Sequence, residues 1–142
     1  MKELVFRAAT RLKITTVLVA NQSLQTPFGN PLITSVRVAG GADVADRYIV
    51  EHSEPGDLCV TQDIPLAALL VPKHVAVLDP RGDEHTAESI GERLSMRDFM
   101  EQMRSDGVVT GGPPPYDARA RQAFAGSLDR VLTRLLRAPR LR

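Results

Sequence analysis

The chain has 142 residues, a length that suits one ordinary domain. Hydrophobic residues make up 43% of it and charged residues 25%, which excludes a disordered or fibrous protein. The formal net charge of +1 gives no general argument for nucleic acid. No apolar run approaches the roughly 18 residues that span a bilayer, and one cysteine cannot form an internal disulfide. We therefore expect a cytoplasmic protein with no membrane partner.

The charge is unevenly distributed along the chain. Residues 1–37 carry a net charge of +4, residues 38–85 of −6 and residues 86–142 of +3. An acidic middle between basic ends is compatible with a metal site beside an anion-binding rim. Solvated faces of opposite sign explain the same distribution, so both interpretations stay open.

Apolar spacing predicts helices and strands that alternate along the chain. The expected helices cover residues 1–12, 43–53, 64–71, 87–92, 96–105 and 117–137. The expected strands cover residues 15–20, 33–38, 57–61 and 75–78. Such alternation builds right-handed βαβ units. The predicted fold class is therefore α/β: a single three-layer α/β/α domain with a mostly parallel sheet over residues 1–137, followed by a basic tail at 138–142.

The start of the chain does not fit this architecture. Domains of this kind usually open with a strand in the centre of the sheet, whereas Met1 already occupies an apolar position of the first helix. We therefore expect the first strand to be missing and the strand at 15–20 to have an exposed edge. Such edges pair with other chains, so an oligomer through this edge is expected.

Six short motifs follow one another in a specific order. They are Val19-Ala20-Asn21-Gln22, Gly41-Ala42-Asp43-Val44-Ala45-Asp46, Gly56-Asp57-Leu58-Cys59-Val60-Thr61-Gln62-Asp63-Ile64-Pro65-Leu66-Ala67, Asp79-Pro80-Arg81-Gly82, Arg93-Leu94-Ser95-Met96-Arg97-Asp98-Phe99-Met100 and Thr110-Gly111-Gly112-Pro113. Together they resemble the YaiI/YqxD family of uncharacterised bacterial proteins, which is assigned to the PIN-like nuclease superfamily. The resemblance extends from residue 2 to about residue 132.

The resemblance implies a fold and a chemistry. PIN-like domains gather carboxylates at the carboxyl ends of parallel strands, where these hold one or two Mg²⁺ or Mn²⁺ ions that activate water for phosphodiester cleavage. RNA is then the expected partner. Family members also begin with a strand carrying Asp-Ala-Asp-Ala-Cys-Pro, whose first aspartate is a principal metal ligand in PIN-like domains. That segment is absent from this sequence.

Three aspartates are the candidate metal ligands. Asp43, Asp46 and Asp63 follow predicted strands, and carboxylate oxygens suit hard divalent cations. We expect Asp43 and Asp63 to be catalytic as well. The structural alternative is that Asp43 and Asp63 cap the helices that they precede, a role that does not exclude metal binding.

Three further polar residues are candidates for positioning a phosphate. Asn21 follows the strand at 15–20, Thr61 ends the strand before Asp63, and Arg81 follows the strand at 75–78. Asn21 could hold a carboxylate in place, Thr61 could orient a water, and Arg81 could pair with a phosphate. An Asx-turn, an ordinary β-branched strand residue and a surface arginine are the respective alternatives.

Two other segments could contact an anion. The Gly111-Gly112 pair exposes backbone N–H groups, although a flexible turn explains it equally. The last helix carries Arg130, Arg134 and Arg137, with Arg140 and Arg142 beyond it, and these could follow a nucleic-acid backbone or form a solvated face.

The function expected from the sequence is a divalent-metal-dependent nuclease or phosphoesterase acting on RNA. The rival function is a non-catalytic module that keeps the fold and binds RNA or a protein. The missing first strand favours the rival for this chain, because loss of one carboxylate ligand of three or four weakens a metal site.

Overall fold

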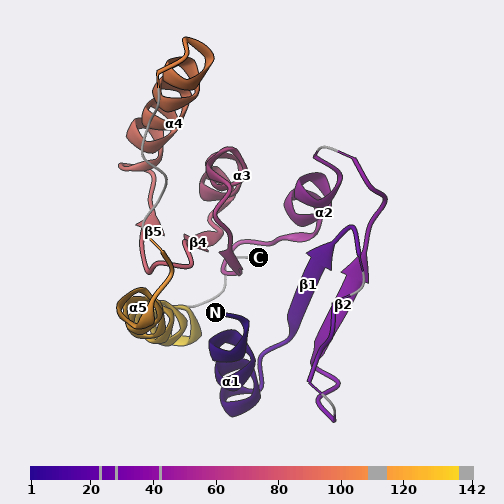
Figure 1. The fold of residues 1–142 in the computed structure, drawn as a ribbon. Coiled ribbons are helices and arrows are strands. Elements are labelled where there is room, and N and C mark those ends of the chain that lie inside the picture. Colours follow the sequence, from indigo (N-terminus) through magenta and orange to yellow (C-terminus); the bar gives the residue numbers. More distant parts are fainter. Residues whose placement is uncertain (23, 28, 42, 109–114, 138–142) are drawn as a thin grey trace. The chain divides into compact units, whose positions relative to one another are not determined.

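The computed structural model describes residues 1–22, 24–27, 29–41, 43–108 and 115–137. Within these ranges the chain is an α/β protein, as predicted, in which helices alternate with strands of two small, mostly parallel sheets (Figure 1). The chain divides into two compact units, Met1–Ser53 and Glu54–Arg142. The predicted Gly111-Gly112 turn and the basic tail at 138–142 lie outside the described residues. No helix in the described part of the chain is long and apolar enough to cross a membrane.

The first unit contains two helices and a parallel pair of strands. Its elements are α1 (Lys2–Leu12), β1 (Thr16–Ala20), β2 (Ile33–Arg37) and α2 (Val44–His52). The register places Thr16 opposite Ile33 and Ala20 opposite Arg37. Among the described residues β1 pairs with β2 alone, and the Val17 side chain is 46% exposed. One edge of β1 therefore has no strand partner within the described ranges, and a missing first strand stays a prediction.

The second unit contains the other sheet and the longer helices. Its elements are β3 (Leu58–Val60), α3 (Ile64–Leu70), the short 3₁₀ helix η1 (Val71–Lys73), β4 (Ala76–Leu78), β5 (Glu84–His85), α4 (Ile90–Ser105) and α5 (Ala118–Arg137). β3 and β4 run parallel, and β5 returns antiparallel to β4. The β4–β5 hairpin lies alongside α5 (Figure 1).

The core of the second unit is built where α3, β4 and α5 meet. Leu66 and Leu70 of α3, Val77 and Leu78 of β4, and Phe124 of α5 are all at most 2% exposed. The apolar residues of α3 and α5 recur on one face of each helix, and this spacing is why the sequence predicts both helices. Burial of side chains of this size stabilises the fold by about 1.5–3 kcal/mol each.

The second unit differs from the sequence prediction in two places. The predicted helices at 87–92 and 96–105 are one continuous helix, α4, which begins after a turn in which the Ser89 amide donates to Thr86 Oγ1 at 3.2 Å. No glycine or proline lies between the two predicted segments, so nothing interrupts the backbone hydrogen bonds. The sequence also gave no sign of β5, because a strand of two residues shows no alternation.

Candidate functional site

The carboxyl edge of the β3–β4 pair gathers several of the candidate residues. Val60 lies opposite Leu78, and the Thr61 amide donates to the Leu78 carbonyl at 3.1 Å. Because both strands run in the same direction, Thr61 and Asp79 follow them at the same edge of the sheet. In open α/β sheets this edge is where ligands bind.

Thr61 and Asp63 organise the turn from β3 into α3. Thr61 Oγ1 accepts a hydrogen bond from the Asp63 amide at 3.0 Å, and Asp63 Oδ1 accepts one from the Leu66 amide at 2.9 Å. The structural alternative considered for Asp63 is thus confirmed: it is the N-cap of α3. The Asp63 side chain is exposed, and its described hydrogen bond engages Oδ1. A cap of this kind leaves the second carboxylate oxygen available for a ligand.

The turn between β4 and β5 presents Arg81. Asp79 Oδ1 accepts a hydrogen bond from the Arg81 amide at 2.7 Å, and the Gly82 amide donates to the Asp79 carbonyl at 2.9 Å. The Arg81 guanidinium lies 5.8 Å from the centre of the Tyr116 ring, and the Tyr116 hydroxyl donates to the Pro80 carbonyl at 3.0 Å. A cation over an aromatic ring is stabilised at this distance. Arg81 is therefore held by the turn and the tyrosine at the same edge as Asp63.

Two contacts dock the β4–β5 hairpin on α5. Ser127 Oγ donates to the Gly82 carbonyl at 2.6 Å and accepts from Arg130 Nη2 at 2.9 Å. Arg134 donates through both terminal nitrogens to Glu84, at 3.2 and 2.6 Å. The hydrogen bond with Glu84 raises the pKa of the Arg134 guanidinium, which therefore stays protonated. Glu84 of the hairpin thus holds Arg134 directly, and Ser127 of α5 connects Arg130 to the hairpin.

His85 of β5 is a buried polar group without a hydrogen bond. It is 4% exposed, and neither ring nitrogen has a hydrogen-bond partner among the described residues. Burial lowers the pKa of His85 from its ordinary value, and Arg93 lowers it further, whereas Asp79 and Asp83 act in the opposite direction. The imidazole is therefore held neutral in the folded protein.

Three candidates belong to the first unit. Asn21 follows β1 and is exposed. Asp43 precedes α2 with a φ of 70° and makes no side-chain cap, so the capping role considered for it is absent from the structure. Asp46 lies in the first turn of α2 and already has a polar or electrostatic interaction within the protein. The geometry of the first unit thus supplies two aspartates about one helical turn apart.

The six predicted site residues divide between the two units. Asn21, Asp43 and Asp46 lie in the first unit, and Thr61, Asp63 and Arg81 lie in the second. Within either unit, no three His, Cys, Asp or Glu side chains of the described residues lie close enough together to hold a metal ion. Neither unit by itself therefore fits a closed centre made of three protein ligands.

Sequence reasoning missed the part played by Asp79 and by the hairpin. The sequence predicts no ligand role for Asp79, which belongs to the motif Asp79-Pro80-Arg81-Gly82. Yet Asp79 follows β4 as Asp63 follows β3. A signal was available, because a parallel arrangement of these two strands brings both aspartates to one edge. The pair of Glu84 with Arg134 spans 50 positions and had no such signal.

Comparison with known proteins decides the family. A family model described as "Uncharacterized BCR, YaiI/YqxD family" matches residues 1–134. The chain belongs to this family. This YaiI/YqxD chain is 56% identical over 137 residues to a UPF0178 protein of Myxococcus xanthus, covering 96% of this chain and 89% of the relative. A UPF0178 protein of Bordetella petrii is 52% identical over 138 residues, covering 97% and 91%. No solved structure matches the chain.

Proposed function

We propose that this YaiI/YqxD protein is a divalent-metal-dependent phosphodiesterase that acts on RNA. The observation that carries the proposal is the parallel β3–β4 pair, whose carboxyl edge carries Thr61, Asp63 and Asp79 and presents Arg81 on the following turn. Carboxylates next to a fixed guanidinium suit a phosphate ester that is bound together with a cation.

The residues of this edge fit an open magnesium site. Mg²⁺ commonly takes one or two carboxylates and completes its coordination with water and substrate phosphate. Asp63 and Asp79 supply two carboxylates at one edge, so a closed set of three protein ligands is not required. Asp43 and Asp46 belong to the first unit and are proposed, as the resemblance implies, as ligands of Mg²⁺ or Mn²⁺ in their own right. When bound, the cation would lower the pKa of a water and neutralise charge on the phosphate.

The remaining groups of the edge bind and orient the substrate. Arg81 is positioned to pair with a phosphate through two N–H donors, because Asp79 and Tyr116 hold its turn and its guanidinium. The Thr61 hydroxyl accepts a hydrogen bond from the Asp63 amide. Its own proton can still be donated to a water or a phosphate oxygen. Asn21 is proposed to assist a carboxylate from the first unit.

A non-catalytic RNA- or protein-binding module is the second candidate function. One observation favours it: within either unit the described residues bring together no three metal-ligating side chains. In that case Asp63 serves only as the cap of α3 and Asp79 only as the anchor of the Arg81 turn. The two functions differ in whether the charge of Asp63 matters beyond its capping role.

The decisive experiment separates the charge of Asp63 from its cap. Asparagine caps helices about as well as aspartate, so Asp63→Asn keeps the turn into α3 and removes the charge. Asp117→Asn is the matched control, since Asp117 caps α5 by accepting from the Ala120 amide at 3.0 Å. Mn²⁺ binding is measured by titration calorimetry, and cleavage of a labelled RNA is followed with Mn²⁺ present.

We expect wild type and Asp117→Asn to bind Mn²⁺ equally and to cleave RNA. Asp63→Asn is expected to lose at least about tenfold in Mn²⁺ affinity, since its carboxylate charge is gone. Equal binding by both variants would place the metal elsewhere and refute the proposed site. RNA binding by the wild type without cleavage at any Mn²⁺ concentration would establish the binding module instead.

A further inference from the structure

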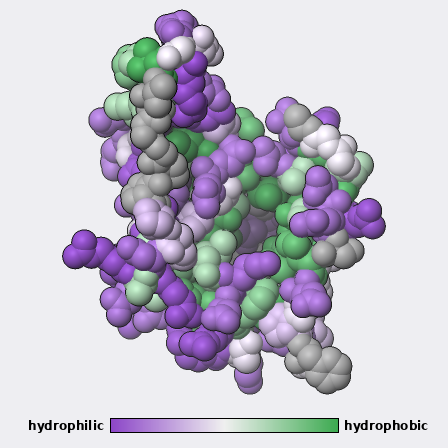
Figure 2. Space-filling model, viewed as in Figure 1, coloured by the Kyte–Doolittle hydropathy of each residue, from purple (hydrophilic) through white to green (hydrophobic). Residues whose placement is uncertain are grey.

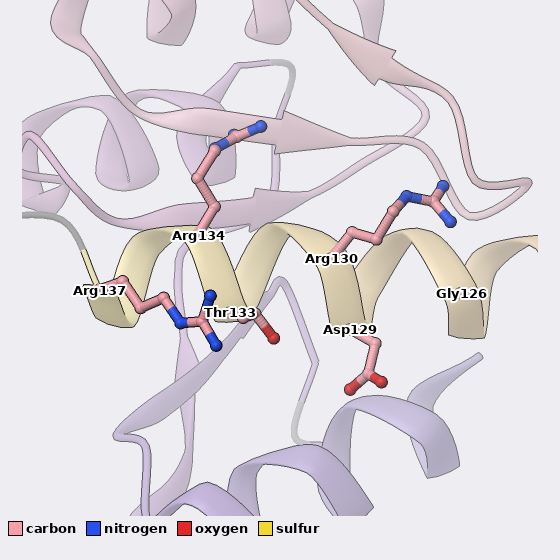
Figure 3. Close-up of a pocket in the computed structure, with 6 residues that line it drawn as sticks. All are labelled: Gly126, Asp129, Arg130, Thr133, Arg134 and Arg137. Carbon is pink, nitrogen blue, oxygen red and sulfur yellow. The ribbon is translucent and has the colours of Figure 1, made fainter.

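The outward face of α5 forms a shallow groove lined by arginines. Its lining residues are Gly126, Asp129, Arg130, Thr133, Arg134 and Arg137 (Figure 3). The opposite face of the same helix is anchored in the core by Phe124, Leu128 and Val131, which are at most 5% exposed. Because the apolar face is fixed, the arginine face is held toward solvent, and the visible surface over α5 is mostly hydrophilic (Figure 2).

Two of the three arginines are held in defined positions before any ligand binds. Arg130 and Arg134 extend toward one side of α5, and Arg137 extends toward the other (Figure 3). The Ser127 hydroxyl holds Arg130, and Glu84 holds Arg134. The described hydrogen bond of Arg130 engages Nη2, and a guanidinium has five N–H donors in all. Side chains that are already ordered lose less entropy when they bind a ligand.

The spacing of the arginines selects the kind of ligand. Arg130 and Arg137 are seven residues apart, which is about 10 Å along a helix axis. A single phosphate group is too small to reach both, whereas a chain with repeated phosphates can contact them in succession. Among the described lining residues, Arg130 and Arg137 face one acidic side chain, Asp129, and the third arginine, Arg134, is paired with Glu84. The remaining positive charge favours a polyanion.

We infer that the α5 groove binds the phosphate backbone of single-stranded RNA without reading its sequence. This inference rests on the proposed function for the choice of RNA. The described lining residues include no aromatic side chain on which bases could stack. The groove and the β3–β4 edge belong to one unit, and Ser127 links the groove to the Gly82 turn beside Arg81. The groove therefore supplies binding energy remote from the site of cleavage.

The test measures RNA binding in EDTA, so that no metal and no cleavage contribute. A labelled oligouridine is titrated with the whole chain, and fluorescence anisotropy is recorded at several salt concentrations. The variants are Arg130→Gln, Arg137→Gln and the double substitution. Arg104→Gln, at an exposed arginine in the last turn of α4, is the matched control for net charge. Thermal unfolding of every variant checks that the fold is retained.

Because Glu84 already pairs with Arg134, phosphate contacts by Arg130 and Arg137 predict that log K falls with log salt with a slope of about −1.4 for single strands. Each groove substitution is expected to reduce this slope by about 0.7 and to weaken binding about fivefold at 0.1 M salt. Arg104→Gln removes one charge outside the groove, so it should leave the slope unchanged and weaken binding less than either groove substitution does. An oligothymidine should bind as well as oligouridine, because the backbone alone is contacted.

Equal affinities for Arg104→Gln and the groove variants would overturn the inference, and so would an absence of RNA binding in EDTA. Neither result bears on the proposed metal site, because the Asp63→Asn calorimetry tests that site separately. Conversely, RNA binding that depends on the groove but is never followed by cleavage would support the inference and refute the enzyme.

Discussion

Replacing Gly82 with alanine tests whether the β4–β5 hairpin is docked closely on α5. A Cβ at this position would lie 2.8 Å from both the carbonyl carbon and the carbonyl oxygen of Ala123. Both atoms belong to the backbone of α5, so neither can rotate away. Gly82 also has a φ of +99°, which side chains of L residues rarely adopt. The substitution must therefore push the hairpin off the helix.

The expected cost has three parts. An unfavourable backbone conformation costs about 1–3 kcal/mol, and an overpacked contact costs about 1–3 kcal/mol. Moving the hairpin also weakens the hydrogen bond from Ser127 to the Gly82 carbonyl, which is worth about 1 kcal/mol. Together these parts predict a loss of about 3–7 kcal/mol, a large share of the 5–15 kcal/mol by which domains are stable.

Gly107→Ala is the matched control for the backbone conformation alone. Gly107 has a φ of +83°, and no described atom lies within 4 Å of its Cβ position. The control should carry only the backbone part of the cost, about 1–3 kcal/mol. Urea unfolding followed by circular dichroism measures both variants. If Gly82→Ala costs no more than Gly107→Ala, the close approach of hairpin and helix is wrong.

Three further results are expected. Leu66→Ala, at a buried side chain, should lower the free energy of unfolding by about 2–5 kcal/mol. Leu69→Ala, at a side chain 58% exposed in the same helix, should lower it by less than about 1 kcal/mol. Similar losses for both variants in urea unfolding would contradict the burial of Leu66. Because the folded protein lowers the pKa of His85 below the value of 6.5 in the unfolded chain, stability should decrease as pH falls below about 6.5. His85→Met should flatten this dependence when unfolding is measured in EDTA across pH, and exposed His52→Gln should not. Val17→Lys, at the one exposed residue of β1, should shift the chain toward monomer in sedimentation velocity, and an unchanged distribution would contradict association through that strand.

The helices and strands that were predicted well are those with a strong local pattern. Phe124, Leu128 and Val131 recur at helical spacing, and the predicted helix at 117–137 agrees with α5 to within one residue. The predicted strand at 15–20 agrees equally well with β1. Backbone hydrogen bonds of a helix and the alternation of a strand involve neighbours in sequence, so a single sequence contains the information.

The candidate site was predicted only in part. The sequence predicts that Asp63 binds metal and offers a helix cap as a compatible role, and the structure confirms the cap. Asp43 precedes a helix in the same way, yet its left-handed backbone conformation accompanies a side chain that makes no cap. A cap requires both the residue type and a backbone angle, and the sequence supplies only the first. Whether any aspartate binds metal stays a prediction.

The sequence by itself determined the α/β class, the family and most of the element positions, because these depend on local periodicity and on motifs that are contiguous in the chain. Only the tertiary structure decided that Glu84 holds Arg134, that Gly82 lies against α5 and that the buried His85 side chain has no hydrogen-bond partner among the described residues. These contacts join residues up to 50 positions apart. Their partners are chosen by packing and by the direction of the strands, and neither leaves a pattern that a single sequence shows.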